Sequence, residues 1–391
     1  MRHRSGFVLA CVIAACGTAV ADSPARAPAC APPVSDDDWP VSTPQAGGFD
    51  PAALCSELSK LSAGNLNVHG LLIERHGQLV AELYRAGPDH PISVRYGLNN
   101  PWQSSTRFDA DTIHDVRSVS KSIVSLVYGI ELAKGRAPPP ETPVLEVYRD
   151  LSPPWSRDAS ITFQHLLTMS TGLLWHEWGR SALTSDETSL YWRSKTVRFV
   201  LDRPVTAAPG RTFNYSSGGT AVLAETLART SGTPLAELAN TDLFGPLGIT
   251  RFEWTADLHG RALAFSGLRL RPRDMLKIGR LLSSRGVWRG RQVVPQSWIE
   301  ASTRARIATG VGLVALDGEA VSYGYQWWTA RMPWRGRELA WVAAVGNGGQ
   351  RILAVPDLDL TVVLTGGDYG SPDIQSAESS LLRSLLAALA A

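Results

Sequence analysis

The chain carries the stretch Ser118-Val119-Ser120-Lys121 at the head of an apolar segment that ends at Gly135. Apolar residues recur there at helical spacing, which predicts a helix with Ser118 in its first turn and Lys121 one turn later on the same face. A serine hydroxyl becomes a nucleophile when a base takes its proton, and a buried lysine with a lowered pKa can be that base. A capping serine followed by a surface lysine is the alternative for so short a pattern.

Strand-like segments lie on both sides of a mostly helical region. Residues 69–75 and 78–84 predict a hairpin, and residues 86–110 are predicted to be a loop. Helix-like patterns run from 118 to about 251. Strands are predicted again at 323–332, 338–345, 351–355 and 361–365, and a terminal helix at 373–391. This order predicts an α+β fold, in which strands from both chain ends form one antiparallel sheet flanked by helices, with an all-helical domain inserted at about 118–251.

A second candidate for catalysis is Tyr215, which lies in the turn Asn214-Tyr215-Ser216-Ser217-Gly218-Gly219 before a predicted helix. A neighbouring lysine ammonium lowers the pKa of a phenol, so Tyr215 could accept the Ser118 proton and return it to a leaving group. The alternative is a packing tyrosine in an ordinary turn.

A third candidate is the turn between two predicted strands near the C-terminus, formed by Gly346, Asn347, Gly348 and Gly349. Glycine lets a backbone approach a ligand closely. An N–H group of residues 346–350, together with the Ser118 N–H, would form an oxyanion hole. An ordinary hairpin turn is the alternative.

These elements together resemble the serine β-lactamase and penicillin-recognising superfamily. The resemblance is to its class C-like branch, close to 6-aminohexanoate-dimer hydrolases and family VIII esterases, and it spans about residues 65–370. Besides Ser118-x-x-Lys121, it is carried by residues 161–173 (ITFQHLLTMSTGL), 209–217 (PGRTFNYSS) and 323–328 (YGYQWW). The resemblance implies a sheet domain built from both chain ends and a helical insertion.

Two positions depart from the pattern of that superfamily. Its tyrosine motif ends in asparagine, where this chain has Ser217, and the cation of its Lys-Thr-Gly or His-Thr-Gly element is missing near residues 344–348. Arg351 is a possible substitute for that cation. The missing cation weakens the assignment to β-lactamases and D-Ala-D-Ala carboxypeptidases, which remain alternatives, as does a non-hydrolytic penicillin-recognising sensor module. Substrate contacts are predicted for Ser217, Trp175 and Tyr325.

The N-terminal residues have the features of an export signal. A basic start, an apolar stretch from Gly6 to Val20 and the site Ala19-Val20-Ala21 predict a signal peptide over residues 1–21. Cys16 lies in a lipoprotein-like box, so lipidation there is the alternative and the one predicted route to a membrane. Residues 22–49 are predicted to be a Pro-rich arm before a hydrolase domain at 50–391. Cys30 and Cys55 are predicted to form a disulfide in an oxidising compartment, either periplasmic or extracellular.

The composition limits the classes of partner. The formal net charge of +2, with dispersed Lys and Arg, predicts no nucleic-acid partner. The sequence contains no P-loop, Rossmann or zinc-ligand spacing, so neither a cofactor nor a metal is expected, and His114-Asp115 is predicted to be strand structure. The predicted function is that of an exported serine hydrolase, which cleaves a small ester or amide through an acyl-enzyme on Ser118.

Overall fold

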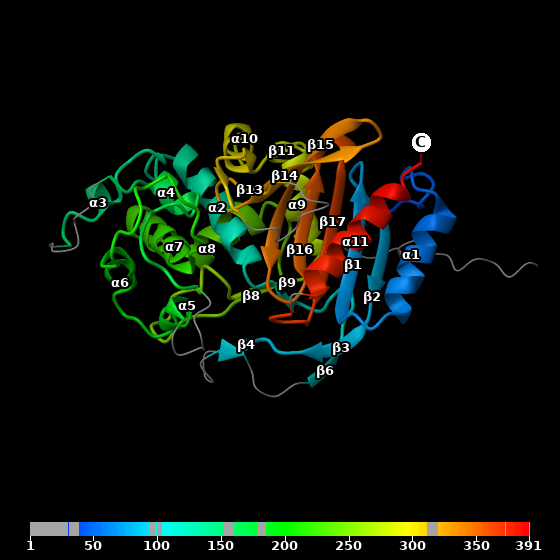
Figure 1. Cartoon of the computed structure of the whole chain (residues 1–391), viewed down its shortest axis with the longest axis horizontal. Helices are drawn as coiled ribbons and strands as arrows, with labels where there is room; N and C mark the ends of the chain where they lie inside the picture. Colours follow the sequence, from blue (N-terminus) through cyan, green and yellow to red (C-terminus); the bar gives the residue numbers. More distant parts are fainter. Residues whose placement is uncertain are drawn as a thin grey trace, which may run out of the picture.

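A long antiparallel sheet forms the centre of the computed structural model, which describes residues 30, 39–93, 98–99, 104–151, 160–177, 185–310, 320–371 and 373–390 (Figure 1). The strand order is β12-β13-β14-β15-β16-β17-β1-β2. The bounds are β12 Ile307–Ala308, β13 Ser322–Tyr323, β14 Trp328–Trp334, β15 Arg337–Gly346, β16 Gln350–Val355, β17 Leu360–Gly366, β1 Val68–Arg75 and β2 Gln78–Tyr84. The strand β1 pairs with β17, so the two ends of the chain meet in the middle of the sheet.

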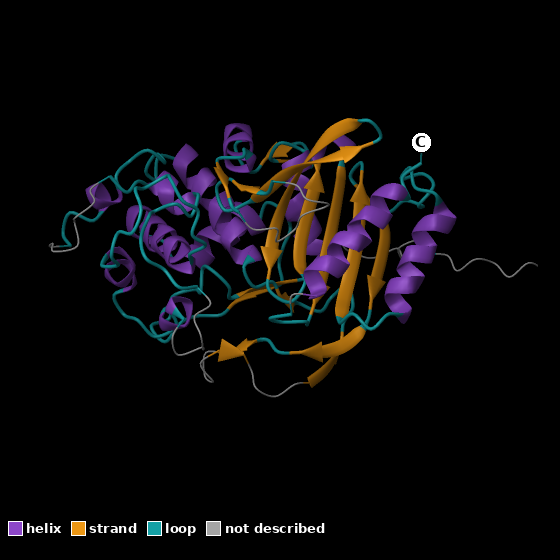
Figure 2. Ribbon diagram, in the orientation of Figure 1, coloured by secondary structure: helices purple, strands orange, loops and turns teal. Residues whose placement is uncertain are grey.

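Alternation of side chains along the strands lets the sheet bury both faces. Leu71 and Ile73 of β1 pack in the core cluster that includes α1 (Pro51–Ala63) and α11 (Asp373–Ala387). Leu72, between them, points into the cluster that includes α9 (Pro272–Ser283) and the helical region. Figure 2 shows α1 and α11 in front of the strands and the other helices to the side and behind. This arrangement confirms the predicted α+β fold.

The helical region lies beside the sheet and begins directly after Ser118 (Figure 1). Its helices are α2 Val119–Ala133, α3 Val144–Val147, α4 Phe163–Leu167, α5 Asp186–Ser189, α6 Thr196–Leu201, α7 Ser217–Ser231, α8 Leu235–Ala239 and the π-helical η3 Asn240–Phe244. The remaining helices are α10 Gln296–Thr303 and the 3-10 helix η4 Pro356–Leu358. Helix α2 packs on both α7 and β15, and it therefore connects the helical region to the sheet.

Short strands link the two parts below the sheet. They are β3 Ala86–Asp89 with β6 Ser104–Arg107, β4 Ile92–Ser93 with β5 Leu98–Asn99, and β7 His114–Asp115 with β9 Leu268–Leu270 and β8 Phe252–Trp254. The pair β10 Val287–Trp288 and β11 Arg291–Gln292 lies instead near α10, at the top of Figure 1. The prediction of a loop over residues 86–110 was wrong, because β3 and β6 pair there. The two strands are short and are separated in sequence by a connection rich in Pro, Gly and Asn, so local sequence patterns do not indicate that they pair.

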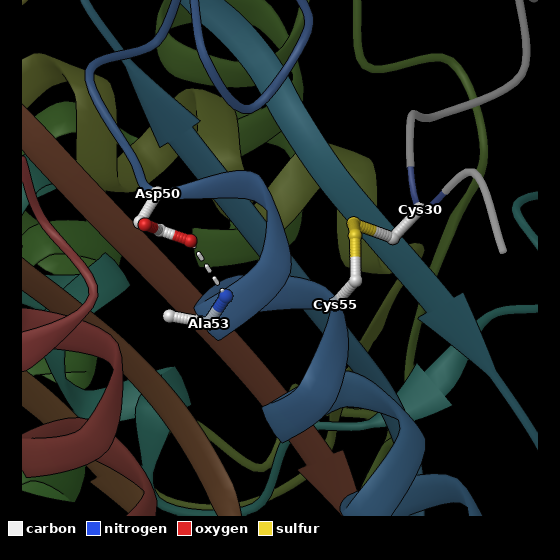
Figure 3. Close-up of a disulfide and its surroundings, with 4 residues drawn as sticks. All are labelled: Cys30, Asp50, Ala53 and Cys55. Carbon is white, nitrogen blue, oxygen red and sulfur yellow. Dashed lines mark hydrogen bonds between the residues drawn. A yellow bond between two sulfur atoms is a disulfide. The ribbon is translucent and has the colours of Figure 1, made fainter. Parts of the chain in front are cut away.

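The disulfide between Cys30 and Cys55 is present, with its Cα atoms 5.5 Å apart, as predicted (Figure 3). Cys55 lies in the first turns of α1, where Asp50 caps the helix by accepting a hydrogen bond from the Ala53 N–H at 2.8 Å. The predicted signal peptide, Cys16 and most of the predicted arm lie outside the described residues. Among the described helices, none is long and apolar enough to cross a membrane.

Candidate active site

The turn that precedes α2 presents Ser118 without using its side chain as a cap. Arg117 has a φ of 50°, in the left-handed region that non-glycine residues seldom occupy. The Ser120 hydroxyl holds the turn by donating to the Arg117 carbonyl at 2.6 Å and accepting from the Leu268 N–H at 3.2 Å. Ser118 occupies the N-cap position, but its side chain makes no capping hydrogen bond. Its hydroxyl is therefore available for chemistry.

Lys121 is a buried residue, with only 1% of its surface exposed, and its amine points back at the serine. Nζ donates to Ser118 Oγ at 3.0 Å and to the Phe265 carbonyl oxygen at 2.9 Å. The separation of three residues places both side chains on one face of the first turn of α2. The alternative of a surface lysine is therefore wrong.

Tyr215 completes the cluster from the start of α7, although it lies far from Ser118 in sequence. Its hydroxyl forms hydrogen bonds with both Ser118 and Lys121. The ring stacks on Trp328 with centroids 5.9 Å apart, and Lys121 Nζ lies 4.9 Å from the ring centre. The ring is therefore held by β14 on one side and by the Lys121 ammonium on the other.

The protonation state of this cluster differs from the one expected from sequence. Burial raises the pKa of Tyr215, and the opposing effect of Lys121 does not cancel the increase. Burial lowers the pKa of Lys121, whereas the charge that Tyr215 carries once it is ionised and the negative charge of Glu177 raise it, and the net change is upward. The resting cluster at neutral pH therefore holds an ammonium and a protonated phenol, and it must lose one proton before it can accept the Ser118 proton.

Two glutamates act on Lys121 through their charge, the buried Glu177 and the partly exposed Glu187. Glu177 Oε1 is 4.0 Å from Lys121 Nζ. Glu177 Oε2 accepts hydrogen bonds from Trp175 Nε1 at 2.6 Å and from the Ser217 N–H at 2.8 Å. Burial and the charge of Glu177 raise the pKa of Glu187 to about 7, although Lys121 and Arg117 act to lower it. The lysine therefore lies in a field of negative charge that favours its ammonium form.

The end of β15 passes directly beside the nucleophile turn. A Cβ atom on Gly346 would lie 2.4 Å from the carbonyl oxygen of Val116, two residues before Ser118. Gly348 and Gly349 have φ values of 87° and 99°, and side chains there would press on Tyr369 and Glu378. Asn347 is exposed, and its Oδ1 accepts a hydrogen bond from the Gly370 N–H at 2.8 Å. Glycine at these positions thus lets the turn fit between the nucleophile and the C-terminal segment.

Comparison with known proteins agrees with this geometry. The model of the family described as Beta-lactamase matches residues 70–379. The chain belongs to the β-lactamase family. It is also 28% identical over 316 residues to a 6-aminohexanoate-dimer hydrolase from Paenarthrobacter ureafaciens, which covers 77% of this chain and 73% of the relative.

Solved structures share the β-lactamase-family fold. EstCE1, a hydrolase with promiscuous acyltransferase activity, has a TM-score of 0.65 at 15% identity over 87% of this chain and 99% of its own. The octameric penicillin-binding protein homologue from Pyrococcus abyssi has a TM-score of 0.61 at 17% identity, over 87% of this chain and 78% of its own. The protein is therefore a hydrolase of the β-lactamase fold, in a family in which a serine acyl-enzyme is typical.

Three residues predicted to contact substrate have other partners in this family member. The Ser217 hydroxyl is buried and donates to Glu177 Oε1, so it is already bound within the protein. Trp175 is 4% exposed and packs beneath α7, where a Cβ atom on Gly218 would meet its ring at 2.7 Å. Tyr325 is 2% exposed and donates to Gln164 Oε1 at 2.9 Å.

Arg351 does not replace the missing family cation. Its guanidinium is buried, lies 2.6 Å from Glu378 Oε2 on α11, and donates to the Gly346 and Gln350 carbonyl oxygens at 2.9 and 2.8 Å. These bonds anchor the turn to α11. The side chain is therefore committed to the interior of the fold rather than to a substrate carboxylate.

Sequence reasoning missed Glu177 as a neighbour of Lys121, and it missed the aromatic wall around Tyr215. Tyr323 and Phe213 lie beside Trp328, with ring centroids 5.0 and 5.8 Å from it. The 323–328 motif was a usable signal for this wall. No local pattern, however, indicates that the carbonyl of Phe265 would hold Lys121, because that contact depends on a loop 144 residues away.

Proposed function

We propose that this protein is an exported serine hydrolase that cleaves a small ester or amide through an acyl-enzyme on Ser118. One observation carries the proposal. Lys121 Nζ lies 3.0 Å from Ser118 Oγ, and the Tyr215 hydroxyl is hydrogen-bonded to both residues. Two segments that are distant in sequence, the starts of α2 and α7, thus place two proton-carrying groups on one hydroxyl.

Acylation begins when the Lys121–Tyr215 pair has released one proton. The pair then takes the Ser118 proton as Oγ attacks the carbonyl carbon, and the negative charge moves to the carbonyl oxygen. The Ser118 N–H and an N–H of the 346–350 turn stabilise that oxygen. Tyr215 returns the proton to the leaving alcohol or amine as the carbon–heteroatom bond breaks, which leaves the acyl group on Oγ.

Deacylation uses the same groups in the reverse direction. The pair removes a proton from a water molecule, the resulting hydroxide attacks the acyl carbon, and the Ser118–acyl bond breaks. The proton returns to Ser118 Oγ, and the acid product leaves. No group beyond the protein and water is needed for the balance of atoms and charge.

The environment favours an uncharged acyl group. The family cation that would pair with a substrate carboxylate is absent from the sequence, and Arg351 is bound to Glu378. The partly exposed ring of Phe213, which packs against the buried Trp328 next to Tyr215, supports an apolar substituent there. The names of the relatives, a 6-aminohexanoate-dimer hydrolase and a hydrolase with acyltransferase activity, support amide and ester substrates.

The decisive experiment compares the wild type with Ser118→Ala on p-nitrophenyl esters, linear amide oligomers, nitrocefin and D-Ala-D-Ala peptides. Ser125→Ala is the matched control, because the Ser125 hydroxyl is buried on the same helix and makes no hydrogen bond within the described structure. We expect ester or amide turnover that Ser118→Ala abolishes and Ser125→Ala retains. Full activity of Ser118→Ala would refute the assignment of Ser118 as the nucleophile. Turnover of only nitrocefin or D-Ala-D-Ala peptides would indicate a β-lactamase or a D-Ala-D-Ala carboxypeptidase. Acylation of Ser118 without turnover would indicate a non-hydrolytic sensor module.

Export is tested separately, by the intact mass of the protein secreted from a Gram-negative host. Cleavage after Ala21 gives a chain that begins at Asp22. A lipidated chain that begins at Cys16 would replace the soluble form with a membrane-anchored one. Retention of residues 1–21 would contradict the proposed signal peptide.

A further inference from the structure

A buried cluster outside the catalytic site contains His69 of β1, Asp89 of β3 and His114 of β7. Their exposed fractions are 0%, 5% and 1%. One ligand-type atom from each residue lies within 4.8 Å of the others. The three residues come from three strands that meet only in the folded protein, so no metal-ligand spacing is visible in the sequence.

The hydrogen bonds of His69 fix the position of its proton. Nε2 faces two acceptors, Asn67 Oδ1 at 2.9 Å and the Pro88 carbonyl oxygen at 3.1 Å. The orientation of the Asn67 amide follows from its own Nδ2, which donates to the Pro88 oxygen at 2.8 Å. Nε2 therefore carries the hydrogen, and in the neutral ring Nδ1 is a bare lone pair.

The same reasoning applies to His114. Its Nδ1 lies 3.0 Å from the carbonyl oxygen of Asp115, which can only accept, so Nδ1 carries the hydrogen and Nε2 is bare. The two bare nitrogens, His69 Nδ1 and His114 Nε2, are 2.7 Å apart. Two lone pairs at that distance repel each other unless a proton or a cation lies between them.

A third proton on the pair of rings is disfavoured. Burial lowers the pKa of His69 to about 4, with His114 acting in the same direction and Asp89 in the opposite one. Burial also lowers the pKa of His114, although Asp89 acts to raise it. The hydrogen bonds assign one N–H to each ring and leave one bare nitrogen on each, which is the form in which imidazole binds metals.

We propose that His69 Nδ1, His114 Nε2 and the Asp89 carboxylate bind a divalent transition metal, with Zn²⁺ the ion that best fits two imidazoles and one carboxylate. Each ring already donates its other N–H to a carbonyl oxygen, the arrangement that orients metal-bound histidines. Asp89 Oδ1 is held by the Tyr369 hydroxyl at 2.6 Å and by the His90 N–H at 3.0 Å. Asp89 Oδ2 is the oxygen left to face the ion.

Metal binding would require a small adjustment of the cluster, and a surface hollow lies next to its hydrogen-bond partners. Zn–N bonds of about 2.0–2.1 Å at tetrahedral angles would separate the two ring nitrogens by roughly 3.3 Å. Their present separation is 2.7 Å, so small rotations that move each nitrogen by a fraction of an ångström suffice. A surface hollow of about 790 Å³ is lined by Asn67, Pro88 and Tyr369, which are hydrogen-bond partners of the cluster. A water molecule from this hollow would complete the coordination.

The ion would act through the fold rather than on the substrate. His114 lies four residues before Ser118, and the next residue, Asp115, accepts a hydrogen bond from the Arg117 N–H at 3.1 Å. Coordination would tie β1 and β3 to the strand that enters the nucleophile turn. We therefore expect bound metal to raise thermal stability.

The test measures metal content and thermal melting of the full mature chain, first stripped with a chelator and then supplied with Zn²⁺ or Co²⁺. We expect about one ion per chain by mass spectrometry of the metal, a Tm several degrees higher than that of the stripped protein, and visible ligand-field absorption with Co²⁺. The variants His114→Ala and Asp89→Asn should lose both the ion and the increase in Tm. His76→Ala removes an exposed histidine near Asp359 and should behave as the wild type.

Two results would overturn the proposal. One is a wild-type chain that binds neither ion at concentrations that saturate ordinary zinc proteins, with a Tm unchanged by either. The other is a full complement of metal in both cluster variants. If His114→Ala does not fold, the conservative variant Asp89→Asn and the cobalt spectrum of the wild type still decide the outcome.

Discussion

Glu177 Oε1 lies 4.0 Å from Lys121 Nζ, and both side chains are almost completely buried. The carboxylate is itself held by Trp175 and by the backbone of Ser217, so it cannot swing away. A fixed negative charge at this distance favours the ammonium form of the lysine. Glu177 thus sets how readily the catalytic pair gives up the proton that must leave before acylation.

The wild-type enzyme should gain activity as pH rises. Burial raises the pKa of Tyr215, and the pKa of Lys121 also lies above its usual value, with the negative charge of Glu177 acting to raise it, so the pair is fully protonated at neutral pH. The form that accepts the Ser118 proton appears when one proton is lost. We therefore expect kcat/KM to increase from neutral into alkaline pH with a single limb. A profile that is flat or falling over this range, measured with an ester of pH-independent reactivity, would contradict this protonation state.

Glu177→Gln should move that limb to lower pH. The substitution removes the negative charge and keeps an oxygen for the Trp175 and Ser217 donors, so Lys121 loses a partner that favours its ammonium form. A shift of about one pH unit is expected for the loss of an opposite charge at this distance. Glu225→Gln, which removes a half-buried carboxylate paired with Arg261, is the control and should leave the limb in place. A shift of the limb to higher pH in Glu177→Gln would contradict the role of Glu177 in favouring the ammonium form of Lys121.

Tyr215→Phe and Lys121→Ala should each lower kcat by a factor of about 10² to 10⁴, the usual contribution of a positioned proton-transfer group. Tyr215→Phe keeps the ring stacked on Trp328 and removes only the hydroxyl. Tyr325→Phe also removes one tyrosine hydroxyl, which donates to Gln164 Oε1 at 2.9 Å. Its kcat should stay within a few-fold of the wild type. Equal losses in both tyrosine variants would mean that the effect is structural.

Gly346→Ala should impair catalysis through the backbone. The added methyl group would lie 2.4 Å from the Val116 carbonyl oxygen, so β15 and the nucleophile turn must move apart. We expect kcat to fall at least about tenfold, since misplacement by an ångström can lower rates 10²-fold. Gly219→Ala is the matched control, because its nearest contact would be an ordinary 3.5 Å and alanine favours the α7 helix. Wild-type kinetics in Gly346→Ala would show that the close approach of β15 to the nucleophile turn is not needed for catalysis.

Replacing both Cys30 and Cys55 with serine should lower stability and leave catalysis unchanged. The bridge closes a loop between residues 25 apart, for which chain entropy gives about 3 kcal/mol of stabilisation. Chemical denaturation with and without reductant measures this difference. The disulfide is attached to α1 (Figure 3), whose apolar side chains pack in a different core cluster from those of α2, so the kcat/KM of the folded double variant should match the wild type. A large loss of activity would connect the N-terminal arm to the site.

The order of strands and helices followed from local patterns. Apolar runs in residues 69–84 and 338–365 correspond to strands that do pair, because a sheet covered on both faces buries successive side chains. The spacing of Ser118 and Lys121 predicted their contact, since residues three apart share a helix face. The motif around Tyr215 identified the third member through its resemblance to the family rather than through any contact visible in sequence.

Contacts between distant segments decided the rest. Glu177, the Phe265 carbonyl and Tyr323 surround the catalytic groups only after the helical region has folded against the sheet. The pKa changes depended on burial and on these neighbours, so the expected lowered values of Lys121 and Tyr215 were wrong in direction. His69, Asp89 and His114 illustrate the same limit. The sequence by itself determined which elements form and which residues carry the chemistry, but only the tertiary structure decided their charge state and their partners, because both depend on desolvation and on distances through space.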